Sequence, residues 1–224
     1  MLTKTQNNVV SYTGAVVFFV IALAVFARPP NSSAPSGTAD PGAAAGFSQL
    51  SLASALWSLH FARRALESAF LEKHVSSNVS LSDSLAEFAY YWIFAVWIAH
   101  SLATQDKSLP LLSFPPAIAV CGWVAAELAN FYAHFMLSRT PANHEKRTVP
   151  ASRLFSLVCC PHYLCEILSW LFFCVCSPFV STVVFASAGA AIMTGYALER
   201  HRKYAASDPS FAKSGRKAIM PYIL

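Results

Sequence analysis

The longest charge-free run in the chain lies between Glu166 and Glu199, where no Asp, Glu, Lys or Arg occurs. The hydrocarbon core of a bilayer is about 30 Å thick, so one spanning helix needs about 20 mostly apolar residues. Together with the apolar residues from Leu154 onward, this run is long enough for two such helices, and Ser177 and Pro178 mark a turn between them. We therefore expect an integral membrane protein.

Four further stretches between charged residues have the same character. They lie between Lys4 and Arg28, Asp40 and Arg63, Glu87 and Asp106, and Lys107 and Arg139. The second continues as a more polar helix towards Phe70, and the fourth is interrupted only by Glu127. Charged residues make up only 12% of the sequence, against about 25% in an average soluble domain. The sequence predicts an all-α, polytopic membrane protein with about six transmembrane helices.

Basic residues gather on one side of the expected membrane. With the N-terminus inside, fourteen of the sixteen Lys and Arg residues fall on inside segments, and only Arg28 and Lys107 fall outside. The formal net charge of +5 is then explained by topology and by contact with lipid headgroups, so no nucleic-acid partner is expected. A signal peptide is the alternative interpretation of the first stretch, although its apolar run is long and the cleavage site poor.

A segment of different composition separates the first two stretches. Pro29 to Gly46 is rich in Pro, Ser, Ala and Gly, and it is expected to be an exposed loop. It contains a glycosylation triplet at Asn31, which the topology places on the lumenal side. We expect two parts, an N-terminal helix with its loop over residues 1–54 and a C-terminal membrane domain over residues 55–224.

Ionisable and amide side chains recur at helical spacing within or beside the apolar stretches. They form three groups: Glu127, Asn130 and His134; His60, Arg63, Arg64 and Glu67; and His162, Tyr163 and Glu166. Charged groups within a membrane are costly unless they face a cavity or a partner, so the groups together can line a polar pocket open to the inside. They can equally form hydrogen bonds between helices, or reach headgroups at the membrane surface. Spacing alone leaves both interpretations open.

Common signatures of soluble enzymes are missing from the sequence. It contains no GxGxxG, P-loop, HExxH or CxxC pattern. Cys159, Cys160 and His162 could bind a metal by residue type but lack a known ligand spacing, so no metal site is expected.

Several short motifs occur in the order found in one membrane-enzyme family. They are Leu-His-Phe-Ala-Arg-Arg-Ala-Leu-Glu (59–67), Glu-Leu-Ala-Asn-Phe-Tyr-Ala-His (127–134), Lys-Arg-Thr-Val-Pro (146–150), Cys-Pro-His-Tyr-Leu-Cys-Glu (160–166), His-Arg-Lys-Tyr (201–204) and Arg-Lys-Ala-Ile-Met-Pro-Tyr (216–222). On these motifs the chain resembles the steroid 5-alpha-reductase family over residues 55–224, and most closely its very-long-chain trans-2-enoyl-CoA reductase branch.

The resemblance implies an all-helical reductase whose inward-facing pocket holds NADPH and reduces a carbon–carbon double bond conjugated to a carbonyl. It implies Tyr163 as the catalytic acid. The cofactor-binding residues that it implies are Asn130, His134, Arg147, Glu166, His201 and Tyr204.

The sequence departs from the family at several of these positions. His162 stands where the enoyl reductases have Asn, and an imidazole does not reproduce an amide's hydrogen bonds. Phe61 replaces a Tyr and Arg63 a Lys. A glycine pair of the steroid branch aligns with Ser152 and Arg153.

These departures lead to two hypotheses. The first is a catalytically degenerate reductase fold that serves as an accessory subunit of a membrane complex in the mitochondrial inner membrane. Such a subunit would contact lipids and other membrane-protein subunits, and would hold bound lipid or no cofactor. The alternative is an active NADPH-dependent trans-2-enoyl-CoA or steroid-type reductase of the endoplasmic reticulum.

Overall fold

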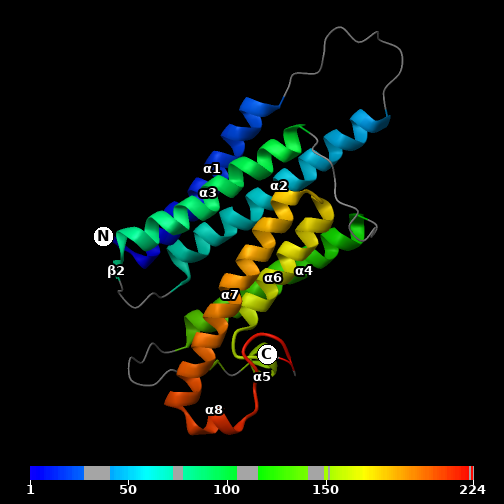
Figure 1. Ribbon diagram of the computed structural model, residues 1–224. Coiled ribbons are helices and arrows are strands. Elements are labelled where there is room, and N and C mark those ends of the chain that lie inside the picture. Colours follow the sequence, from blue (N-terminus) through cyan, green and yellow to red (C-terminus); the bar gives the residue numbers. More distant parts are fainter. Residues whose placement is uncertain are drawn as a thin grey trace, which may run out of the picture.

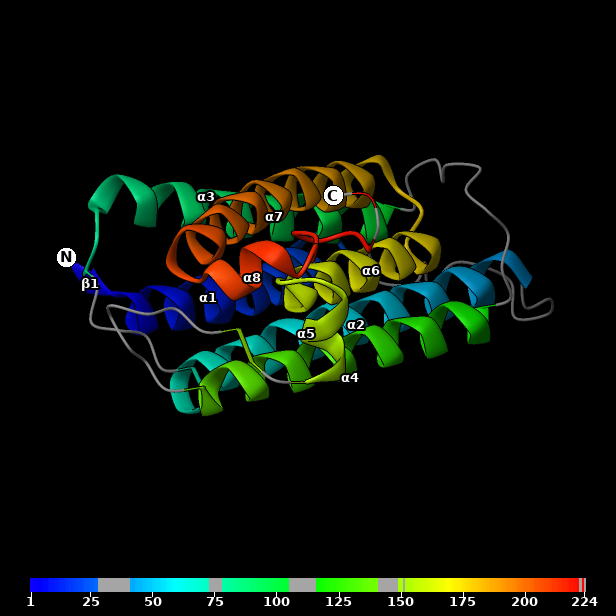
Figure 2. The same cartoon turned by 90° about the horizontal axis from the view of Figure 1, so that it is seen from below.

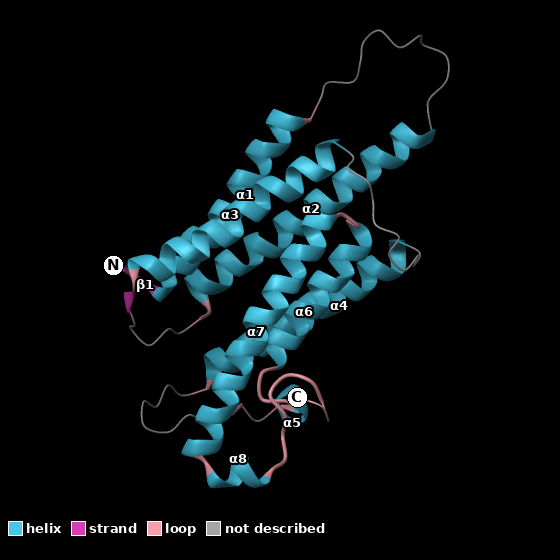
Figure 3. Cartoon of the chain, viewed as in Figure 1, coloured by secondary structure: helices cyan, strands magenta, loops and turns pink. Residues whose placement is uncertain are grey.

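The computed structural model describes residues 1–27, 41–72, 78–104, 116–140, 149–150, 152–221 and 223. Its long helices are α1 (Lys4–Phe26), α2 (Pro41–Phe70), α3 (Leu81–Thr104), α4 (Pro116–Arg139), α6 (Pro161–Cys176) and α7 (Val180–Ser207). The short elements are α5 (Arg153–Leu157), α8 (Pro209–Lys213) and the two-residue strands β1 (Leu2–Thr3) and β2 (Asn78–Val79), which pair antiparallel. Each of the four other predicted stretches overlaps one long helix, and the stretch from Leu154 to Glu199 overlaps two, α6 and α7. The predicted all-α class is therefore confirmed, as Figure 3 shows for the described chain.

The long helices form two groups of three that lie side by side (Figure 1). In one group α1 packs between α2 and α3, and in the other α6 packs between α4 and α7. The groups meet where α3 contacts α7 and where α2 contacts α6. Figure 2 shows α3 and α7 on one side of the molecule and α2 and α4 on the other. The short connection of residues 177–179 makes α6 and α7 antiparallel neighbours.

The helices differ in how well they suit a membrane. Three of the described helices, α1, α3 and α7, are long and apolar enough to cross it, and α6 is a shorter apolar helix. The remaining long helices α2 and α4 carry two of the three polar groups singled out in the sequence. Large apolar side chains such as Val25 and Ile93 are exposed on the outer surface, where lipid covers them. The chain is an integral membrane protein.

An aromatic cluster around Trp57 joins the two groups. The buried Trp57 ring stacks on Phe19 at 5.3 Å between centroids and lies 5.6 Å from Trp170 and 5.3 Å from Phe185. Its Nε1 donates a hydrogen bond of 3.2 Å to the carbonyl of Ala15, which satisfies the indole in the interior. Side chains from α1, α2, α6 and α7 thus meet at one point.

Phe61, one of the departures from the family, belongs to the same cluster. Its ring is buried and contacts Tyr12 at 6.0 Å and Tyr91 at 5.4 Å between centroids. An apolar ring fits these surroundings without needing a hydrogen-bond partner. Aromatic packing between α1, α2 and α3 therefore explains why Phe can stand at position 61 in place of the family's Tyr.

Gly14 allows α1 and α3 to approach closely. A Cβ atom at Gly14 would lie 2.1 Å from Nε1 of Trp92, which donates a hydrogen bond to the carbonyl of Ser11. We expect Gly14→Ala to lower the free energy of unfolding by about 1–3 kcal/mol, because the rigid indole must move. Gly195→Ala on α7 is the matched control, since nothing lies within 4 Å of its added Cβ. Thermal unfolding in detergent measures both, and equal shifts would contradict close packing at Gly14.

The prediction of an exposed loop from Pro29 to Gly46 is partly wrong. Residues 41–46 form the first turns of α2, whereas residues 29–40, including Asn31, lie outside the described residues. Pro41 suits the first position of a helix and the alanines at 43–45 favour one, so the low-complexity composition was misleading there. The division between residues 54 and 55 falls within α2 and stays a prediction.

Candidate functional site

Charged side chains of α2 and α4 meet in the interior. Nδ1 of His60 lies 2.8 Å from Oε1 of Glu127, and Nε of Arg63 donates to Oε2 of the same carboxylate at 2.9 Å. Nη2 of Arg63 also donates to Oδ1 of Asn130 at 2.9 Å. His60, Glu127 and Asn130 are buried. Two of the polar groups predicted from helical spacing therefore face each other.

A second set of ion pairs continues this arrangement towards the end of α2. Nη1 of Arg64 contacts Glu67 and also lies 2.9 Å from Oε1 of Glu72, which is 3.2 Å from Nδ1 of His134. The Arg64 guanidinium lies over the ring of Tyr12 at 5.4 Å, so α1 also borders the polar interior. Glu72 was not identified as a site residue from the sequence. Its position could have indicated it, because Glu72 lies only two residues after the end of α2, which carries His60, Arg63, Arg64 and Glu67.

Glu67, Glu72 and His134 offer ligand atoms within 4.8 Å of one another. This spacing would suit a metal ion, but the Arg64 guanidinium already contacts both carboxylates. A cation in that position neutralises the pair without a metal. We therefore interpret the three residues as part of an ion-pair network.

The N-terminal end of α6 adds the third predicted group. Nδ2 of Asn130 donates to the carbonyl of His162 at 2.7 Å and lies 3.5 Å from Oε2 of Glu166. Oε1 of Glu166 is 3.9 Å from Nε2 of His60. Pro161 occupies the first turn of α6, where its missing N–H costs nothing, and fixes the start of the helix beside α4. The polar cluster thus joins α2, α4 and α6.

Tyr163 connects this cluster to α7. Its ring centroid lies 4.1 Å from that of His162, and the guanidinium carbon of Arg200 lies 5.4 Å from the Tyr163 centroid. A cation over an aromatic face is attracted by the ring's electron density. Arg200 was counted in the sequence only as an inside positive charge, and its contact with Tyr163 depends on how α6 and α7 pack.

His201 and Tyr204 lie further along α7 and contact the C-terminal segment. Nε2 of His201 is 2.8 Å from the carbonyl oxygen of Arg216, and the Tyr204 ring lies 5.6 Å from Phe211. Backbone hydrogen bonds from Cys159 and Cys160 to residues 217 and 218 hold this segment against the start of α6. Of the predicted cofactor residues, Asn130, His134 and Glu166 lie in the cluster. His201 and Tyr204 instead contact the C-terminal segment, and Arg147 lies outside the described residues.

Several buried polar atoms in this region have no hydrogen-bond partner among the described residues. They are Nδ1 and Nε2 of His162, Nε2 of His134 and Nε of Arg64. Leaving a buried polar group unsatisfied costs about 1–3 kcal/mol. His162 is 2% exposed, so its ring cannot rely on bulk solvent. The cluster therefore offers hydrogen-bonding groups to a polar ligand.

Comparison with known proteins places this arrangement in a family. The family described as 3-oxo-5-alpha-steroid 4-dehydrogenase matches residues 78–224. A probable very-long-chain enoyl-CoA reductase of Caenorhabditis elegans is 32% identical over 182 residues, covering 75% of this chain and 57% of the relative. The very-long-chain enoyl-CoA reductase of Dictyostelium discoideum is 28% identical over 173 residues, covering 75% and 56%.

A more distant match is the polyprenal reductase of Caenorhabditis elegans, 30% identical over 188 residues, covering 77% of this chain and 60% of the relative. The chain thus spans a little more than half the length of these curated relatives. The range matched by the family contains Asn130, Tyr163 and His201. The chain belongs to the steroid 5-alpha-reductase family, on its enoyl-CoA reductase branch.

Proposed function

We propose that the chain is an NADPH-dependent reductase that acts on the carbon–carbon double bond of trans-2-enoyl-CoA thioesters in the endoplasmic reticulum membrane. The names of its relatives support this activity, and such enzymes fit that membrane. Neither these matches nor the described residues give support to a degenerate accessory subunit or to a mitochondrial location. The reductase alternative is therefore preferred to the accessory-subunit hypothesis.

The observation that carries the proposal is a buried polar cluster with unsatisfied atoms beside a tyrosine. The free nitrogens of His134 and His162 suit the amide and hydroxyl groups of a nicotinamide nucleotide. We propose that the cofactor is held by Asn130, His134, Arg147, Glu166, His201 and Tyr204. When bound, NADPH supplies the hydride that adds to the β-carbon of the substrate.

Tyr163 is the proposed acid. Addition of hydride to the β-carbon leaves an enolate, and the Tyr163 hydroxyl gives its proton to the α-carbon, so that the C=C bond becomes CH–CH. The negative charge left on the phenol oxygen is stabilised by Arg200, whose guanidinium lies over the ring. His162 packs on the same ring and fixes its orientation. The phenol then regains a proton from water at the inside face.

The test uses the full chain purified in detergent. We expect NADPH to bind, as followed by its fluorescence, and to be oxidised when trans-2-hexadecenoyl-CoA is added. A steroid with the same conjugated unit is the comparison substrate. A protein that neither binds nor oxidises NADPH, and that copurifies with a constant set of subunits, would overturn the proposal.

A further inference from the structure

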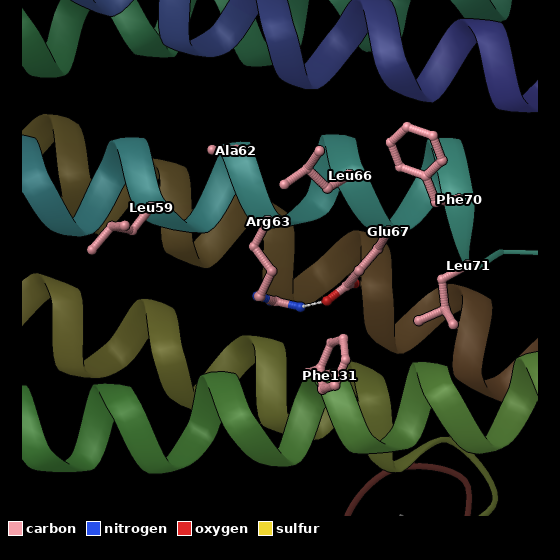
Figure 4. A pocket seen from close by; sticks show the side chains of 8 residues that line it. All are labelled: Leu59, Ala62, Arg63, Leu66, Glu67, Phe70, Leu71 and Phe131. Atoms are coloured by element: carbon pink, nitrogen blue, oxygen red, sulfur yellow. Dashed lines mark hydrogen bonds and ion pairs between the residues drawn. The ribbon is translucent and has the colours of Figure 1, made fainter.

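An apolar groove separates α2 from α4 beside the polar cluster. It has a volume of about 580 Å³, within the range of about 300–1,000 Å³ that is usual for ligand pockets. Figure 4 shows Leu59, Leu66 and Phe70 on α2, and Phe131 on α4 pointing towards Arg63 and Glu67. Arg63 and Glu67 extend from α2 towards α4 and are the two charged residues of the lining, here called its floor.

The floor of the groove carries no free charge among the described residues. Arg63 contacts Glu67 through Nη1, Glu127 through Nε and Nη2, and Asn130 through Nη2. Every donor nitrogen of this guanidinium is therefore engaged, so the groove offers no anchor for a phosphate headgroup. The remaining lining is apolar, which selects an uncharged hydrocarbon occupant.

The mouth of the groove opens sideways. Leu59 is 60%, Leu66 59% and Phe70 85% exposed. Where such side chains face the hydrocarbon of the bilayer, a chain already dissolved there can enter the groove without crossing water. Beside the groove, polar side chains such as Arg63 and Glu127 bridge the two helices, with 2.8 Å between Nη2 of Arg63 and Oε2 of Glu127.

We propose that this groove holds the acyl chain of the enoyl-CoA substrate, an inference that rests on the proposed function. Arg63 marks the boundary between the groove and the polar cluster, which continues through Asn130 to His162 and Tyr163. The hydrocarbon tail lies in the groove and the thioester end lies on the polar side of this boundary. Because the groove is open at its side, it sets no upper limit on chain length, and the tail continues into the bilayer.

Photolabelling tests the position of the tail without requiring catalysis. The probe is hexadecanoyl-CoA with a diazirine near the end of its chain, applied to the full chain in phosphatidylcholine nanodiscs. We expect labels on Leu59, Leu66, Phe70 or Phe131, and loss of label when unmodified hexadecanoyl-CoA is added. Labels confined to other helices would overturn the proposal. Equal labelling of the groove by a diazirine phosphatidylcholine would also overturn it, because it would indicate ordinary lipid contact.

Substitution at the groove tests its role in selectivity. Ala62 lines the groove, and Ala62→Trp fills it; Ala24→Trp makes the same change on the exposed surface of α1. We expect the ratio of kcat/KM for trans-2-hexadecenoyl-CoA to that for trans-2-butenoyl-CoA to fall about tenfold in Ala62→Trp, because the indole displaces the long tail and misplaces the thioester joined to it, whereas the four-carbon chain does not reach the groove. The ratio should stay unchanged in Ala24→Trp.

An unchanged ratio in both variants would contradict the groove as the acyl site while leaving the reductase activity established. If the wild type reduces neither substrate, the proposed function fails. The photolabelling result then still decides whether an acyl chain binds in the groove.

Discussion

Replacing Tyr163 by Phe should lower kcat for enoyl-CoA reduction by about 10²–10⁴-fold. The change removes only the hydroxyl, which is the group proposed to protonate the α-carbon. The ring remains, with its contacts to His162 at 4.1 Å and to Arg200 at 5.4 Å. NADPH affinity should therefore stay within about twofold of the wild type, since the loss lies in the transition state.

Tyr196 provides a matched control for this change. Its ring lies 6.4 Å from Tyr163 on α7, and it is exposed. Tyr196→Phe removes the same atom from a neighbouring position and should leave kcat unchanged. The measurement is steady-state NADPH oxidation together with a fluorescence titration of NADPH for all three proteins. Full activity in Tyr163→Phe would show that Tyr163 is not the acid.

The positions of the helices were predictable because charged residues delimit them. Charges are excluded from the hydrocarbon core, so Lys4 and Arg139 mark ends that the structure places at the ends of α1 and α4. The start of α2 at Pro41 was not predictable in this way, because composition alone does not distinguish a loop from an alanine-rich helix.

Helical periodicity predicted which polar residues share one face of a helix, but not which residues on other helices they contact. Spacing placed Glu127 and Asn130 on one face of α4, and the structure shows this face turned towards Arg63. Glu72 and Arg200 were overlooked because their roles depend on contacts between distant segments. The unpartnered His162 ring likewise becomes visible only when its surroundings are known.

Removing the carboxylate of Glu127 should destabilise the protein by about 1–3 kcal/mol, because Glu127→Ala leaves the buried His60 ring without its hydrogen-bond partner and takes from Arg63 one of its two carboxylate partners. Glu199→Ala is the control, since the Glu199 and Lys203 pair is exposed and such pairs contribute about 0–1 kcal/mol. Chemical unfolding in mixed micelles compares the two. A similar small loss in both variants would mean that water reaches the cluster and screens its charges.

A double substitution then separates the two interpretations that spacing left open. Arg63→Met combined with Glu127→Leu replaces the ion pair by apolar groups of similar volume, and such exchanges are often neutral or stabilising. If the cluster only joins helices, the double variant should regain stability and keep NADPH binding. We expect it to regain stability and to lose NADPH binding by at least about tenfold, because Asn130 loses the Arg63 guanidinium that orients its amide towards the ligand. NADPH binding at the wild-type level in this stable variant would assign the cluster to helix packing alone.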